Sequence, residues 1–183
     1  IKIQLIDNPK VITPAAMNVG IKNSKGEIII KMDAHSIYEK DYISKCVEHL
    51  KESGADNVGG VLKAIPAKNT LTAKAIAISL SHFFGAGGSY FRTGTDKPKE
   101  VDTVAFGCYW KKIFDKIGFF DERMAKIEQL EINFRLRKAG GKIIVEVIKI
   151  METPLVEYNK KKAKKPENKI EEKKKEEVKK EGQ

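Results

Sequence analysis

The chain has 183 residues, of which 41% are hydrophobic and 33% are charged, and its formal net charge is +10. This length predicts one domain with a substantial hydrophobic core. No apolar run approaches the roughly 20 residues that a membrane-spanning helix needs, which excludes such a helix within these residues.

Predicted strands and helices alternate through the first half of the chain. Alternation of apolar residues predicts a strand at 1–6, and Thr13-Pro14 is typical of a helix start. The elements expected in this half are a strand at 1–6, a helix from 13 to about 26, a strand at 27–32, a helix from 41 to 54 and a strand at 57–62. The near-continuous apolar character of 27–32 favours a strand buried on both faces, as in a parallel sheet.

The second half continues the same pattern. The expected elements are a helix at 70–84, a glycine-rich break at 85–89, a polar loop at 93–100, a strand at 101–106, helices at 110–117 and 128–139, and a strand at 142–150. This alternation predicts an α/β layered fold for residues 1–150.

Residues 151–183 are expected to form a charged tail, either disordered or a solvated helix. From Asn159 to Gln183 there are 11 Lys and 6 Glu, so this segment supplies +5 of the net charge and the remainder supplies the other +5. Such a composition cannot bury a core. A contact with a membrane surface is the alternative, which the interspersed Glu residues weaken.

Two cysteines, Cys46 and Cys108, stand far apart in apolar surroundings and fit no metal or redox spacing. We expect buried free thiols. The sequence shows no signal peptide, but it opens on Ile1 in what looks like the middle of a strand, so we expect residues to precede it.

The strand predicted at 27–32 ends in Asp33-Ala34-His35. Ligands of open α/β sheets gather beyond the carboxyl ends of strands. A carboxylate and an imidazole at such a place offer an oxygen and a nitrogen to a divalent cation, which could hold a diphosphate. The alternative is a turn residue beside a surface histidine.

Several further segments, in order, resemble glycosyltransferase family 2, in a branch similar to enzymes of succinoglycan biosynthesis. The segments are Asn8-Pro9-Lys10, Thr13 to Asn18, Gly26 to Ile30, Met32 to His35, Gly54 to Gly60, Val101 to Val104, Phe106-Gly107, Ile117 to Arg123 and Asn133 to Ile143. As an ordered series the resemblance is specific, although each piece alone would be weak.

The resemblance implies a GT-A fold, a Rossmann-like three-layer α/β sandwich with a mostly parallel sheet, here lacking the family's N-terminal base-binding segment. It implies a hexosyltransferase that moves a sugar with inversion from a nucleotide sugar, such as a uridine diphosphate sugar, to a glycan or lipid-linked acceptor. Asp33 would contact the donor and the metal, and His35 the metal, which would be Mn²⁺ or Mg²⁺. Imidazole favours manganese slightly.

The family's catalytic aspartate, which takes the proton of the acceptor hydroxyl, corresponds to Gln129 in this chain. Glutamine cannot act as a general base. Glu128 would be the base if the correspondence shifts by one residue, whereas Glu131 is expected to turn away on the helix. The alternative is that both glutamates are ordinary acids on a helix surface.

The resemblance also assigns substrate contacts to Phe106, Gly107 and Arg135. It implies a cytoplasmic location, at the cytoplasmic face of the membrane or free of it. Two functions remain open: an active enzyme of cell-surface polysaccharide synthesis, or a degenerate domain that binds a nucleotide sugar or glycan. Nucleic-acid binding is not expected, because the basic tail has no interleaved aromatic residues.

Overall fold

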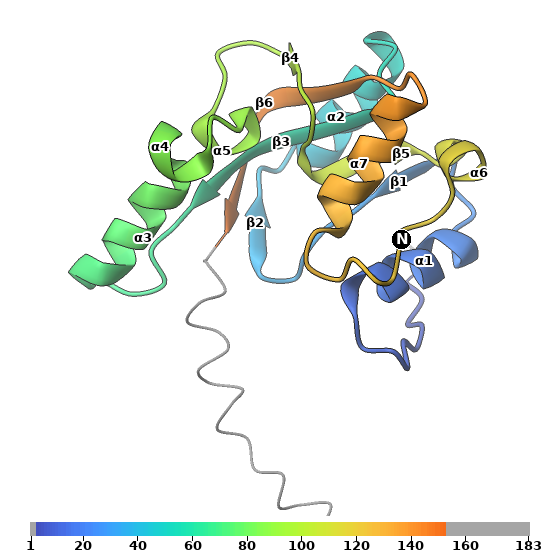
Figure 1. Cartoon of the computed structure of the whole chain (residues 1–183), viewed down its shortest axis with the longest axis horizontal. Helices are drawn as coiled ribbons and strands as arrows, with labels where there is room; N and C mark the ends of the chain where they lie inside the picture. The colour runs from blue at the N-terminus through green and yellow to red at the C-terminus, as the bar shows by residue number, and fades with distance from the viewer. Residues whose placement is uncertain (1–2, 153–183) are drawn as a thin grey trace, which may run out of the picture. The chain divides into compact units, whose positions relative to one another are not determined.

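A computed structural model describes residues 3–152, which belong to one compact unit (Figure 1). The tail predicted at 151–183 lies outside the described residues, apart from Met151 and Glu152. These two residues extend the last strand, which was predicted to end at 150.

The helices of the described residues are α1 (Thr13–Asn23), α2 (Tyr42–Glu52), α3 (Leu71–Ser81), α4 (Phe83–Ala86), α5 (Tyr90–Thr93), α6 (Ile113–Ile117) and α7 (Glu128–Lys138). The strands are β1 (Ile28–Ile30), β2 (Ser36–Tyr38), β3 (Asn57–Ala64), β4 (Lys99–Glu100), β5 (Ala105–Trp110) and β6 (Ile143–Glu152). No helix among the described residues has both the length and the apolar character needed to cross a bilayer.

The strands form one mixed sheet in the order β1-β5-β3-β6-β2, and β4 pairs with β6. Only β3 and β6 run parallel; the other pairs within the described residues are antiparallel. The expectation of a mostly parallel sheet is therefore wrong. The expected burial of the 27–32 strand on both faces is wrong too, because β1 lies at the edge of the described sheet and its three residues are half-buried. A short apolar run carries no information on strand direction or on the place of a strand in the sheet.

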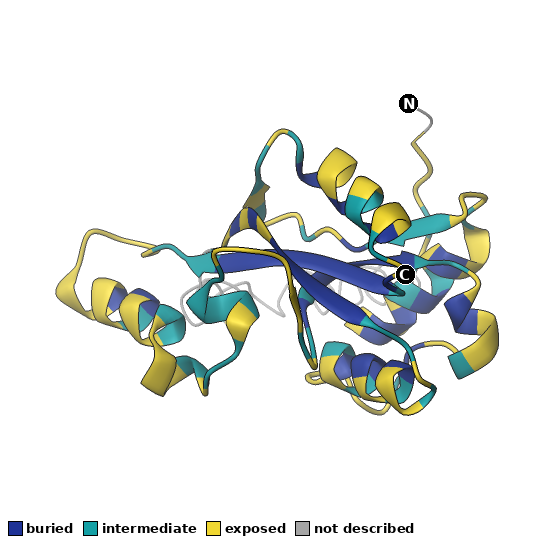
Figure 2. Cartoon of the chain, turned by 90° about the horizontal axis from the view of Figure 1, so that it is seen from above, coloured by how far each residue is buried: buried dark blue, intermediate teal, exposed yellow. Residues whose placement is uncertain are grey.

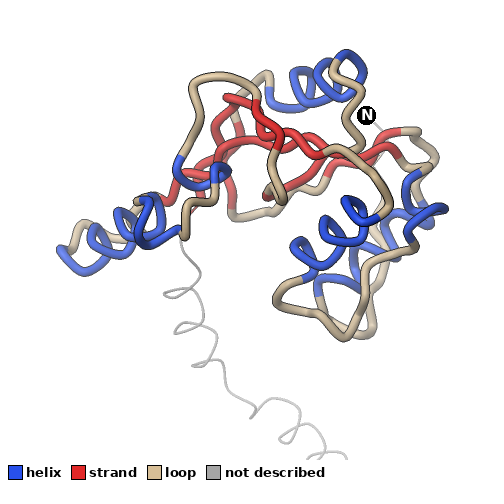
Figure 3. Tube along the Cα trace, turned by 45° about the horizontal axis from the view of Figure 1, so that its top comes forward, coloured by secondary structure: helices blue, strands red, loops and turns tan. Residues whose placement is uncertain are grey.

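Helices cover both faces of this sheet, which confirms the predicted three layers (Figure 3). On one face, α2 contributes Tyr42, Cys46 and Leu50 to a core cluster. On the other, residues of α1, α6 and α7 form a second cluster. The adjacent residues Cys108 and Tyr109 of β5 belong to opposite clusters, as the pleat of a strand requires. Both cysteines are buried free thiols, as predicted.

Three predicted elements differ from those observed. Residues 3–6 form no strand, and Ile3 and Leu5 are almost fully exposed, because no described strand pairs with them. The helix expected at 70–84 ends at Ser81, and α4 follows after an extended His82. The strand expected at 101–106 lies at 105–110, which moves the start of the next helix to Ile113.

Strand β5 contains a β-bulge opposite β3. Between the pairs Val58–Cys108 and Gly60–Ala105, β3 has one residue and β5 has two, Phe106 and Gly107. Phe106 has φ 50°, a left-handed conformation that is rare for a bulky residue. The bulge directs the Phe106 ring into the core cluster that α2 covers.

Candidate metal and donor site

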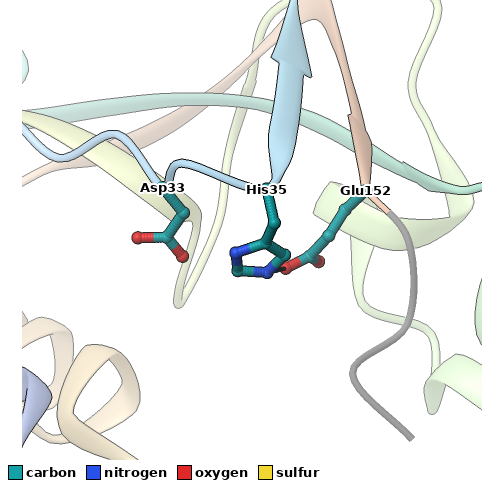
Figure 4. Close-up of side chains that lie close together, drawn as sticks. All are labelled: Asp33, His35 and Glu152. Carbon is teal, nitrogen blue, oxygen red and sulfur yellow. Dashed lines mark hydrogen bonds and ion pairs between the residues drawn. The ribbon is translucent and has the colours of Figure 1, made fainter. Parts of the chain in front are cut away.

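Asp33, His35 and Glu152 bring one ligand atom each within 4.8 Å of one another (Figure 4). Asp33 and His35 lie in the turn between β1 and β2, and Glu152 is the last residue of β6. The antiparallel pairing of β2 with β6 places Ser36 opposite Glu152 and so brings Glu152 close to His35. His35 Nε2 lies 2.9 Å from Glu152 Oε1.

These side chains are partly open to solvent. The exposed fractions are 28% for Asp33, 34% for His35 and 19% for Glu152. Two carboxylates and an imidazole are a suitable donor set for a divalent cation, and the imidazole favours Mn²⁺ over Mg²⁺. The residues present therefore fit the metal that the family resemblance implies.

The cluster is held by residues of the sheet behind it. The Asp33 backbone N–H donates to Tyr38 Oη at 2.7 Å, and the nearly buried Lys31 Nζ lies 3.5 Å from Asp33 Oδ2. Lys31 Nζ also lies 5.0 Å from the centre of the Phe106 ring. Burial raises the pKa of Tyr38 above its ordinary value, and the nearby Asp33 and Glu152 carboxylates add to the rise. The phenol therefore stays neutral at physiological pH.

Phe106 and Gly107 were predicted to contact substrate, but both are packed within the fold. Phe106 is 4% exposed. A Cβ on Gly107 would lie 2.4 Å from Asn57 Oδ1 and 2.5 Å from the Tyr109 ring. The space that the absent side chain leaves is thus filled by this chain's own groups. Phe106 supports the site from behind, through its contacts with Lys31 and Tyr38.

The first turn of α7 contains Glu128, Gln129 and Glu131. Glu128 is 9% exposed and lies on the face of α7 that packs against the sheet. Both polar atoms of the Gln129 side chain are buried without a hydrogen-bond partner. Glu131 forms an ion pair with Arg135, one turn along the helix. The carboxylate of Glu131 is therefore already engaged in this structure.

Arg135 was predicted to contact substrate, yet its guanidinium binds the protein itself. It donates to the carbonyl of Ile117, to that of Gly118 at 3.4 Å and to that of Phe119 at 2.7 Å. Together with the ion pair to Glu131, these bonds use the N–H donors of the Arg135 guanidinium group. Arg135 thus fastens α7 to the segment that follows α6, and its contact with substrate stays a prediction.

Glu152, Lys31 and Tyr38 are the site residues that the sequence did not reveal. Glu152 is 117 positions from His35, and only the pairing of β2 with β6 joins them. No local spacing signals such an encounter. Lys31 and Tyr38, by contrast, flank the Asp-x-His pair directly, so their closeness to the site could have been anticipated.

The layered α/β fold and a strand-end Asp-x-His site define a GT-A type of domain, and comparison of folds agrees. S. aureus TarS, residues 1–349 in complex with UDP-GlcNAc, superposes with a TM-score of 0.50 at 14% sequence identity, covering 75% of this chain and 37% of that one.

The chain belongs to glycosyl transferase family 2, whose family model matches residues 1–118. The matched segment includes Asp33 and His35 but ends before α7. Two curated relatives extend the similarity. ExoA, the succinoglycan biosynthesis protein of Rhizobium meliloti (strain 1021), is 30% identical over 144 residues, covering 78% of this chain and 43% of ExoA.

The second relative is a glycosyltransferase of Methanococcus voltae. Its name is dolichyl N-acetyl-alpha-D-glucosaminyl phosphate 3-beta-D-2,3-diacetamido-2,3-dideoxy-beta-D-glucuronosyltransferase, and it is 27% identical over 150 residues, covering 77% of this chain and 44% of the relative. The chain thus spans less than half the length of the curated relatives that it matches.

Proposed function

We propose that this chain acts in the transfer of a sugar, with inversion, from a nucleotide sugar to a growing exopolysaccharide or cell-surface glycan. The observation that carries the proposal is the Asp33–His35–Glu152 cluster, in a chain of glycosyl transferase family 2. The names of the relatives, in succinoglycan biosynthesis and in glycuronosyl transfer to a dolichyl phosphate glycan, support a glycan or lipid-linked acceptor.

The cluster would hold Mn²⁺ or Mg²⁺ through the Asp33 and Glu152 carboxylates and the His35 imidazole. When bound, such a cation supplies charge neutralisation to the departing nucleoside diphosphate. The Lys31 ammonium, beside Asp33, adds a fixed positive charge on the same side. Tyr38 and the sheet behind it keep the Asp33 backbone in place.

A uridine diphosphate sugar is the first donor to test, because TarS was crystallised with UDP-GlcNAc. We place the reaction on the cytoplasmic side of a membrane, as the family resemblance implies. The donor sugar itself is to be found by measurement.

A second function, that of a non-catalytic domain that binds a nucleotide sugar or glycan, is favoured by one observation. The position of the expected catalytic base is Gln129, and Glu131 is paired with Arg135. Glu128 is the acidic side chain of this turn that forms no ion pair with residues 3–152, and it packs against the sheet. Without a base, the loss in rate is on the order of 10²–10⁴-fold.

Mn²⁺ affinity, measured by calorimetry and by the electron paramagnetic resonance of free Mn²⁺, tests the proposal. Replacing a direct ligand, in Asp33→Asn or His35→Ala, should weaken binding at least about 100-fold, since loss of an outer-shell partner alone commonly costs 10–100-fold. Glu152→Gln should cost at least about 10-fold.

The matched control is Asp41→Asn. It removes the same charge from an exposed carboxylate that pairs with Lys45, so it should leave Mn²⁺ affinity unchanged. Equal affinity in Asp33→Asn and the unmodified chain would overturn the metal site. Metal-dependent UDP binding, with and without turnover, then separates the two candidate functions.

A further inference from the structure

Helix α3 buries two alanines and exposes two of its large apolar residues. Ala73 and Ala77 are 4% and 5% exposed, whereas Leu71 is 87% and Ile78 65% exposed. Leu71 and Ile78 are seven residues apart and therefore share one helix face. A surface helix of a globular protein normally turns its large apolar residues inward and its charges outward. Here Lys74 is the single charged residue of the helix.

Helix α4 extends this apolar surface. Phe83 is 65% and Phe84 89% exposed, and their rings meet edge to face with centroids 5.9 Å apart. Helices α3, α4 and α5 contact one another beside the end of β3, away from α1, α6 and α7 (Figures 1 and 3). In Figure 2 the α3 and α4 ribbons are mostly exposed. We call Leu71, Ile78, Phe83 and Phe84 the α3–α4 apolar surface.

The segment that carries this surface has no acidic residue. Between Asp56 and Asp96, residues 57–95 contain no Asp or Glu, although the whole chain has 25 of them. The same 39 positions carry four basic residues, which are Lys63, Lys68, Lys74 and Arg92. Lys74 is three residues from Leu71, so it lies on the apolar face of α3.

We propose that the α3–α4 apolar surface docks on an anionic lipid bilayer. Exposed Leu, Ile and Phe beside Lys and Arg, without acids, are the composition that inserts at the boundary of headgroups and acyl chains. A second copy of this chain fits less well, because a symmetric contact would bring the same basic residues together. The docking is peripheral and does not depend on the proposed metal site.

Sedimentation with lipid vesicles tests the proposal on the full chain. We expect binding to vesicles of phosphatidylglycerol and phosphatidylcholine, and at least fivefold weaker binding to phosphatidylcholine alone. The double variant Phe83→Ser/Phe84→Ser should lower the partition coefficient at least tenfold, because two exposed apolar side chains no longer enter the bilayer. The matched control is Leu130→Ser/Phe134→Ser on α7, whose side chains are 52% and 60% exposed; it should bind like the unmodified chain.

Charge is tested in the same assay. Lys74→Glu should lower binding to phosphatidylglycerol vesicles at least tenfold, since each basic residue near an anionic surface contributes about fivefold. Lys51→Glu, on the exposed side of α2, makes the same change elsewhere and should have a much smaller effect.

Several results would overturn the proposal. One is that the unmodified chain does not bind vesicles. Another is that it binds equally well after Phe83→Ser/Phe84→Ser; since every variant keeps the Lys/Glu-rich tail, this would assign binding to the tail. Sedimentation velocity gives a third: a dimer that the Phe variant converts to monomer would make the surface an interface between copies. Circular dichroism on heating checks that each variant is folded.

Discussion

The Asp33–His35–Glu152 cluster and the first turn of α7 both gather acidic residues, but only the cluster leaves its side chains facing one another. In the cluster, the ligand atoms lie within 4.8 Å and come from the turn before β2 and from the end of β6, two strands that pair antiparallel. In α7, Glu131 is neutralised by Arg135, which in turn holds backbone carbonyls. We propose that the cluster receives a cation, whereas the contacts of the helix turn keep α7 in its position.

The largest effect is expected when α7 receives, at position 129, the carboxylate that the family resemblance implies. Gln129→Asp should raise the rate of sugar transfer on the order of 10²-fold, the lower end of general-base assistance. The measurement is donor- and metal-dependent transfer, in the longest natural chain that contains this sequence. Metal affinity should not change, because Gln129 is not one of the three proposed ligands.

Gln129→Asn is the matched control, since it has the shape of aspartate without the charge. It should leave the rate where it was. A different outcome would contradict the idea of a missing base. If the unmodified protein is active and Glu128→Gln abolishes its activity, Glu128 is the base and Gln129 has no part in catalysis.

Arg135→Ala separates a structural arginine from a substrate contact. Loss of the Glu131 pair and of the carbonyl bonds should lower the free energy of unfolding by about 2–3 kcal/mol, in the range of hydrogen bonds to a charged group. Urea denaturation measures it. Arg137→Ala, on an exposed position of the same helix, should change the stability by less than about 0.5 kcal/mol. Unchanged stability with a raised KM would instead return Arg135 to substrate binding.

The layered fold was predictable because most of its elements carry local signals. The apolar runs of β1, β3 and β6 and the apolar spacing of α2 are visible in the sequence. The strand directions were not, since they depend on which segments pair. The bulge at Phe106 and Gly107 was also hidden: a tight contact of Gly107 with Asn57 becomes visible only once β3 and β5 are aligned.

The residues of the candidate site also divide into those that the sequence predicted and those that it did not. Asp33 and His35 were found because only Ala34 separates them along one turn. Glu152 could not be found, because its closeness to His35 follows from a register between distant strands. The engagement of Arg135 was equally invisible, since its acceptors are backbone carbonyls that every residue has.

The smallest expected effect concerns Gln129 alone. Its two amide atoms are buried without partners, and each such atom costs about 1–3 kcal/mol unless a ligand or water satisfies it. Gln129→Met keeps a similar volume and removes both polar atoms, so it should raise the free energy of unfolding by about 1 kcal/mol. Gln4→Met, at an exposed position, is the control and should have no effect beyond about 0.5 kcal/mol. If Gln129→Met instead lowers the stability, the Gln129 amide must form hydrogen bonds in solution, for example with water. The first turn of α7 would then be a satisfied polar site. A gain in stability would mean that this turn, unlike the cluster, keeps a polar group that contributes nothing to the fold.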